Sequence, residues 1–128
     1  MPRPIHFEIH AVNPQRAIAF YTALFDWKFQ QWGDQPYWLV TTGDKAAPGI
    51  DGGLMERRGP APADMAAVNA FVCTVDVASV DDYSKRVVEL GGTIALPKMA
   101  VPTVGWLAYA KDPDGNLFGM ITMDANAK

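Results

Sequence analysis

The sequence has one cysteine, no cluster of basic residues and no long apolar run. Cys73 alone has no partner for an internal disulfide, which fits a reducing compartment. A net charge of −3, with basic residues adjacent only at Arg57-Arg58 and at Lys85-Arg86, argues against nucleic acid. No stretch approaches the roughly 18 apolar residues of a membrane span, and the N-terminal residues lack a signal-peptide core. We therefore expect a cytoplasmic protein with neither a nucleic-acid nor a membrane partner.

Length and composition are those of an ordinary globular protein. The 128 residues are 49% hydrophobic and 20% charged, which is close to the average for soluble domains. A chain of this size builds one hydrophobic core without splitting, so we expect a single domain over residues 1–128.

The pattern of the first half recurs in the second half. Alternating residues 6–12, a helix-like segment and a further alternating segment are followed later by the same order over residues 70–96. Such self-similarity indicates one strand-helix-strands unit used twice. We place the repeats at about residues 4–56 and 69–123, with the proline-containing segment 57–67 as their connector.

Local signals predict the elements of each repeat. Asn13 and Pro14 begin a helix that ends near Phe25, and Ser79 begins a second helix that ends before Gly91 and Gly92. Alternation and turn residues predict the strands. These strands are residues 4–11, 27–32, 37–42, 50–56, 69–75, 93–101, 104–111 and 117–123.

Two glycine-containing segments carry further expectations. Gly52 and Gly53 within a strand invite a β-bulge or the close approach of another group. The segment Asp112-Pro113-Asp114-Gly115 has the composition of a tight turn before the last strand.

Two of these segments together resemble a known family. Residues 16–27, Arg-Ala-Ile-Ala-Phe-Tyr-Thr-Ala-Leu-Phe-Asp-Trp, and residues 111–116, Lys-Asp-Pro-Asp-Gly-Asn, stand at opposite ends of the duplicated pattern. The chain in this respect resembles the glyoxalase/bleomycin-resistance/dioxygenase superfamily, also called vicinal oxygen chelate. The resemblance implies an α+β fold in which two βαβββ repeats form a curled mixed sheet around a cleft. It also implies a homodimer and a divalent metal or small ligand in the cleft.

The resemblance assigns the family's metal ligands to four positions. The first is His6, whose side chain is a suitable ligand. The other three fall near Gly53, on Ala70 and on Gly119, which have no side-chain donor. One histidine does not hold a metal that needs three or four ligands, so we expect the standard metal site to be absent and no cofactor to be bound.

Three interpretations of the polar residues near His6 stay open. His6, Glu8 and Asp51 share one face if the strands are regular, and they would make a displaced site for a divalent metal. Alternatively, His6 is hydrogen-bonded to Glu8 or to water as part of a polar wall. In the third interpretation His6 or Glu8, our candidate catalytic residues, moves a proton without a metal.

Aromatic residues are frequent in the predicted strands. Trp38 and Trp106 either line a ligand pocket or belong to the core, because the faces of each strand alternate between the two. We expect Cys73 to be buried by packing. The predicted ligand-binding residues are His10, Trp38, Asp51, Met55, Thr74 and Trp106.

Two functions remain open. The first is binding of a small organic molecule in an aromatic-lined cleft, in the manner of bleomycin-resistance proteins. The alternative is a metal-dependent lyase or dioxygenase of the glyoxalase type, with non-standard ligands around His6. Fold alone does not decide between binding and chemistry.

Overall fold

The computed structural model describes residues 2–111, 113 and 116–128, so most of the predicted turn at 112–115 lies outside the described residues. The described chain forms two compact units. The first unit is residues 6–71, and the second unit is residues 2–5 together with the described part of 72–128. The N-terminus joins the second unit by a backbone hydrogen bond in which Asp76 N–H donates to Arg3 O at 2.9 Å.

The first unit holds most of β1 (Pro4–Ala11), then α1 (Pro14–Phe25), β2 (Lys28–Gln31), β3 (Tyr37–Thr41) and β4 (Gly52–Glu56). Its strands lie in the order β2-β3-β4-β1. The β1–β4 pair is parallel, whereas β2–β3 and β3–β4 are antiparallel. The unit is therefore a βαβββ repeat with a mixed sheet, as predicted.

The second unit repeats this order with β5 (Val72–Asp76), α2 (Val80–Glu89), β6 (Thr93–Val101), β7 (Gly105–Lys111) and β8 (Leu117–Met123). Its strands lie in the order β5-β8-β7-β6, and β5–β8 is the parallel pair. The predicted fold class, α+β with two βαβββ repeats, is confirmed. The strand predicted from residue 69 begins three residues later, at Val72.

Capping residues set the ends of both helices. The Asn13 side chain accepts a hydrogen bond from Arg16 N–H at 3.1 Å, and Ser79 accepts one from Asp82 N–H at 3.1 Å. At the end of α2, Gly91 has a φ of 93°, which favours glycine. Gly92 N–H then donates to Val87 O at 2.8 Å, which satisfies a terminal carbonyl of the helix. The predicted caps are thus confirmed.

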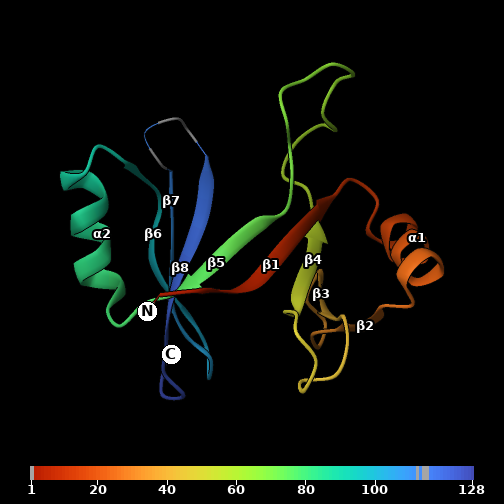
Figure 1. The fold of residues 1–128 in the computed structure, drawn as a ribbon, viewed down its shortest axis with the longest axis horizontal. Helices are drawn as coiled ribbons and strands as arrows, with labels where there is room; N and C mark the ends of the chain where they lie inside the picture. The colour runs from red at the N-terminus through yellow and green to blue at the C-terminus, as the bar shows by residue number, and fades with distance from the viewer. Residues whose placement is uncertain (1, 112, 114–115) are drawn as a thin grey trace. The chain divides into compact units, whose positions relative to one another are not determined.

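Each unit has one helix beside its strands (Figure 1) and a hydrophobic core of its own. In the first unit the core is Phe7, Ile9, Val40 and Leu54, against which residues of α1 pack. In the second unit it is Val77, Val80, Ala108, Ala110 and Met120 under α2. Because side chains alternate along a strand, His6, Glu8 and His10, which alternate with Phe7 and Ile9, face away from α1. This alternation positions the candidate site.

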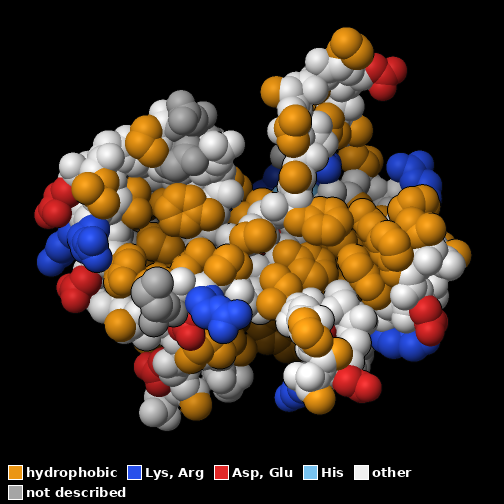
Figure 2. Space-filling view, viewed as in Figure 1, with side chains coloured by type: hydrophobic (Ala, Val, Ile, Leu, Met, Phe, Trp, Pro, Cys, Tyr) orange, Lys and Arg blue, Asp and Glu red, His pale blue; other side chains and the backbone are white. Residues whose placement is uncertain are grey.

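The surface of α1 is strongly apolar. None of its residues is fully buried, and Phe20, Leu24 and Phe25 are each more than half exposed. Figure 2 shows hydrophobic side chains gathered over this helix and the strands beside it. No helix within the described residues is long and apolar enough to cross a membrane.

The cap of α2 yields a stability prediction. Ser79→Ala removes the acceptor for Asp82 N–H and is expected to lower the free energy of unfolding by about 1 kcal/mol. Ser84→Ala, inside the same helix, serves as the matched control and should change stability by less than about 0.5 kcal/mol, because alanine is a good helix former. Chemical denaturation measures both. Equal effects of the two substitutions would contradict the assigned cap.

Candidate functional site

Three polar side chains of β1, those of His6, Glu8 and His10, make up what we call the polar face of β1. They alternate with Phe7 and Ile9, which lie in the core beneath α1. Glu8 is only 8% exposed, although it is a carboxylate. A buried carboxylate requires hydrogen-bond partners, and the polar face supplies them.

A chain of hydrogen bonds joins these side chains through Tyr37 of β3. His6 Nε2 lies 2.9 Å from the Tyr37 hydroxyl oxygen, and that hydroxyl donates to Glu8 Oε2 at 3.2 Å. On its other oxygen, Glu8 Oε1 accepts from His10 Nε2 at 3.0 Å. Both oxygens of the buried carboxylate are thus partnered.

The absence of a side chain at residue 53 makes room for the Tyr37 ring. Gly53 lies beside Glu8 in the parallel β1–β4 pair. A Cβ built on Gly53 would collide with the hydroxyl oxygen and ring carbons of Tyr37. Residue 53 must therefore be glycine for the Tyr37 hydroxyl to reach both His6 and Glu8.

The donors and acceptors in this series of hydrogen bonds determine the tautomer of His6. The Tyr37 hydroxyl has one hydrogen, which it donates to Glu8, so it can only accept from His6. His6 thus carries its hydrogen on Nε2, and in the neutral ring Nδ1 is left as an acceptor. This nitrogen can accept a hydrogen bond or a proton from a ligand.

The electrostatic environment keeps His6 neutral at neutral pH. Burial lowers the pKa of His6 below its ordinary value of 6.5, and this effect outweighs the nearby carboxylates of Glu8 and Asp51, which raise it. The neutral form is the one that has a lone pair on Nδ1.

The end of β1 is attached to the segment after β4 by Arg57. Its guanidinium Nη2 donates to His10 O at 2.7 Å, and its backbone N–H donates to Ala11 O at 2.9 Å. These bonds hold the backbone of His10, whose ring contacts Glu8. Arg57 therefore supports the polar face at the C-terminal end of β1.

The predicted residues of the first unit divide between the two faces of its sheet. Met55 lies beside His10 in the β1–β4 register and so shares the polar face. Asp51 is close enough to His6 to influence its pKa, and its carboxylate accepts from Thr42 N–H at 2.8 Å. Trp38 instead packs against the core under α1, on the opposite face. The structure does not bring Trp38 to the polar face.

Thr74 and Gly119 of the second unit repeat the arrangement of Glu8 and Gly53. Thr74 is 4% exposed and pairs with Gly119 in the parallel β5–β8 ladder. A Cβ on Gly119 would lie 2.7 Å from Thr74 Oγ1, so this glycine also admits a neighbouring side-chain oxygen. Thr74, not Ala70, is therefore the β5 position beside Gly119. Ala70 precedes β5 and lies in no strand.

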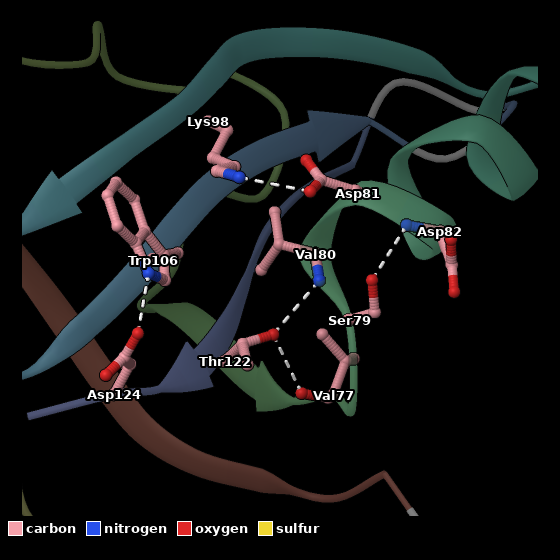
Figure 3. A network of polar contacts seen from close by, with 9 residues as sticks. All are labelled: Val77, Ser79, Val80, Asp81, Asp82, Lys98, Trp106, Thr122 and Asp124. Carbon is pink, nitrogen blue, oxygen red and sulfur yellow. Dashed lines mark hydrogen bonds and ion pairs between the residues drawn. The ribbon is translucent and has the colours of Figure 1, made fainter. Parts of the chain in front are cut away.

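Trp106 lies in a polar network at the start of α2 (Figure 3). Its indole N–H donates to Asp124 Oδ2 at 3.0 Å, and Lys98 Nζ lies 5.0 Å from the centre of its ring. Lys98 also forms an ion pair with Asp81 at 3.0 Å. Trp106 borders a hollow of only about 120 Å³. It lies on the helix-covered face of its sheet, with Ala108 and Ala110.

Of the two alternatives expected at Gly52 and Gly53, the close approach of another group is confirmed, because the Tyr37 ring lies where a Cβ of Gly53 would be. A bulge is not present there, since the register of both glycines with the neighbouring strands is continuous; the irregular strand is β6. The expected burial of Cys73 is wrong, because this residue is exposed. Cys73 lies on the same side of β5 as Val75. Its side chain is left exposed because α2 packs mainly against β6, β7 and β8.

Sequence reasoning missed Tyr37 as a site residue. Tyr37 is one of several aromatic residues in the predicted hairpin, and the sequence pattern does not distinguish it from the neighbouring Trp38 as a pocket residue. The useful signal was a glycine at position 53, where a glycine in a strand permits close approach of another group. Which residue approaches depends on the β3–β4 register.

The residues present do not fit the metal site that the resemblance implies. Among the described residues, no three His, Cys, Asp or Glu side chains are arranged to hold a metal ion. Gly53, beside Glu8, has no side chain that could bind a metal. The Tyr37 phenol fills the space that a metal-binding side chain at residue 53 would need. His6 Nε2 and Glu8 Oε2 both contact that hydroxyl.

The family of the chain is decided by a match over nearly its whole length. The model of the "Glyoxalase/Bleomycin resistance protein/Dioxygenase superfamily" matches residues 3–120. The chain belongs to this superfamily. No curated protein matches the sequence.

Solved structures show the same fold at low sequence identity. A superfamily member from Vibrio splendidus 12B01 has 15% identity and a TM-score of 0.63, covering 95% of this chain and 99% of that one. Methylmalonyl-CoA epimerase from Mycobacterium tuberculosis has 13% identity and a TM-score of 0.62, covering 94% of this chain and 87% of that one. These similarities establish the glyoxalase-superfamily fold and not a reaction.

The contact between Gly53 and Tyr37 can be tested by mutation. Gly53→Ala places a methyl group where the Tyr37 ring lies and should lower the free energy of unfolding by about 1–3 kcal/mol. Gly43→Ala is the control, because its added Cβ meets no atom within 4 Å. In a Tyr37→Ala background, Gly53→Ala should cost much less, since the colliding ring is gone. Additive costs, measured by urea denaturation, would contradict the contact.

The lowered pKa of His6 predicts a pH dependence of stability. The unfolded chain binds a proton at His6 near pH 6.5, whereas the folded chain does so only at lower pH. The contribution of His6 to stability is therefore fully present above pH 6.5 and is lost as the pH falls from 6.5 through the folded pKa. His6→Gln should flatten this fall, measured as the free energy of unfolding between pH 8 and pH 5 (about the range of histidine titration).

Histidine NMR provides the independent check. Titration of the ring signals should show His6 protonating below pH 6.5, with its neutral form carrying hydrogen on Nε2. His10→Gln, which removes the only other histidine, identifies the remaining signal. A His6 signal that titrates above 6.5 would contradict the assignment.

Proposed function

We propose that this protein binds a small organic molecule on the polar face of β1 and that it does so without the superfamily's standard metal. The single observation that supports the proposal is the Tyr37 hydroxyl in the space beside Gly53. It supplies a hydrogen-bonding group to His6 and Glu8 where a metal ligand would otherwise stand.

The surroundings of the polar face indicate the chemistry of the ligand. Neutral His6 offers Nδ1 as an acceptor, which suits a hydroxyl or N–H group of a ligand. Met55 and Leu39 share this side of the sheet, because they pair with His10 and Gly53 respectively. Trp32 contacts the edge of Tyr37 at 6.2 Å between ring centres and is 41% exposed. We therefore propose a ligand that has a hydrogen-bond donor on an apolar body.

The alternative is a metal-dependent lyase or dioxygenase with ligands around His6, and Asp51 is the residue that favours it. Its carboxylate is near enough to raise the pKa of His6. It is also engaged by the backbone and hydroxyl of Thr42, which reduces its capacity to bind a metal. We further propose a cytoplasmic homodimer, whose mass light scattering would measure.

Metal content distinguishes the two functions. The protein, purified without chelator or histidine tag, is expected to contain far less than one divalent metal per chain by plasma mass spectrometry. Titration calorimetry with Ni²⁺, Zn²⁺, Mn²⁺ and Fe²⁺ is expected to show no binding that depends on His6. Near-stoichiometric metal that is lost in His6→Ala would contradict the proposal and favour the lyase or dioxygenase.

Ligand binding is tested on the two faces of β3. A fragment library screened by NMR is expected to yield binders that His6→Ala and Tyr37→Phe weaken about tenfold, the loss of roughly one hydrogen bond to a polar partner. Trp38→Phe is the matched control, since Trp38 lies next in sequence but on the core side. Binders that need Trp38 and not Tyr37 would place the ligand on the opposite face.

A further inference from the structure

A pocket of the first unit lies away from the polar face of β1. It has a volume of about 370 Å³, within the range of small-molecule sites. It lies where β1 ends and α1 begins, and the segment after β4 closes one side with Ala61 and Pro62. It does not include His6, Glu8 or Tyr37.

Among the described residues that line this pocket, two arginines are the only charged ones. Arg16 comes from the first turn of α1, and Arg57 follows β4. No carboxylate of the described residues forms an ion pair with either one. In a chain with a net charge of −3, two cations that form no ion pair among the described residues make a locally positive site.

Arg57 is held in place before any ligand binds. Its Nη2 donates to His10 O at 2.7 Å and its backbone N–H to Ala11 O at 2.9 Å. One guanidinium hydrogen is used in this way, and a guanidinium has five, so its remaining donors are available for a planar anion. An arginine whose side chain is already ordered loses less entropy on binding.

Apart from Asn13, the rest of the pocket wall consists of apolar and aromatic residues. Phe20 and Tyr21 of α1 line it with Ala17 and Pro62, and the two rings meet edge to face at 5.2 Å. Phe20 is 58% exposed. A positive group beside an aromatic wall matches a ligand that is anionic at one end and apolar at the other.

At the corresponding place in the second unit, the positive charge is paired with a carboxylate of the same unit. The hollow at the start of α2 has only about 120 Å³, and its cation is neutralised by the chain itself. Lys98 pairs with Asp81 at 3.0 Å and lies over the Trp106 ring (Figure 3). The first unit has the larger pocket and no such internal anion.

We propose that the pocket between Arg16 and Arg57 binds a small organic anion, with a carboxylate or phosphate on the guanidinium groups and a planar apolar body against Phe20. The Arg16 backbone N–H is already used by Asn13, so the recognition is by side chains. Both anions suit the fork of donors that arginine presents.

The test uses the full chain and defined probes. Titration calorimetry and amide NMR are run with 2-naphthoate, naphthyl phosphate and the uncharged 2-naphthamide. Either anion is expected to bind, with shifts centred on residues 11–21 and 57–62, and 2-naphthamide at least about tenfold more weakly because the ion pairs are missing. Comparison of the two anions shows which group the site prefers.

Substitutions locate the anion. Arg16→Gln and Arg57→Gln should each weaken naphthoate several-fold, whereas Arg58→Gln makes the same change of charge on a residue that does not line the pocket. Tyr37→Phe should leave this binding unchanged, so the result is independent of the ligand proposed for the polar face. Binding of neither anion at millimolar concentration, or equal losses in the Arg16 and Arg58 variants, would overturn the proposal.

Discussion

The missing side chain at residue 53 is the constraint on which the polar face of β1 depends. Because Gly53 has no Cβ, the Tyr37 ring lies against the backbone beside Glu8 and brings its hydroxyl to both Glu8 and His6. That contact partners a buried carboxylate, determines the tautomer of His6 and occupies the place of a metal ligand. A larger residue at 53 would disturb all three features.

The two repeats retain one geometry with different chemistry. In both, a buried oxygen-bearing side chain of the first strand lies beside a glycine of the last strand, Glu8 beside Gly53 and Thr74 beside Gly119. The two repeats also differ in how the positive charges at the starts of their helices are paired. The second unit neutralises Lys98 with Asp81, whereas the first leaves Arg16 and Arg57 without a carboxylate partner among the described residues.

Much of the fold could be predicted because its signals are local. Alternation predicted that His6 and Glu8 share one face of the first strand, and Phe7 and Ile9 indeed lie in the core on the other; the caps at Asn13 and Ser79 set the helix starts. The candidate site was predicted less well. Trp38 and Tyr37 are adjacent, and a one-residue difference in register exchanges the faces on which they lie. No local pattern in the sequence shows which register β3 adopts against β4.

The amino-acid sequence alone thus determined the duplicated βαβββ order, the polar alternation of β1 and the lack of donors at Gly53 and Gly119, since each follows from residue type and short-range spacing. Tertiary structure decided that Tyr37 fills the space at Gly53 and that Arg16 and Arg57 line one pocket. These residues are distant in sequence. They meet only through strand pairing and helix packing, and such contacts between distant residues leave no periodic signal along the chain.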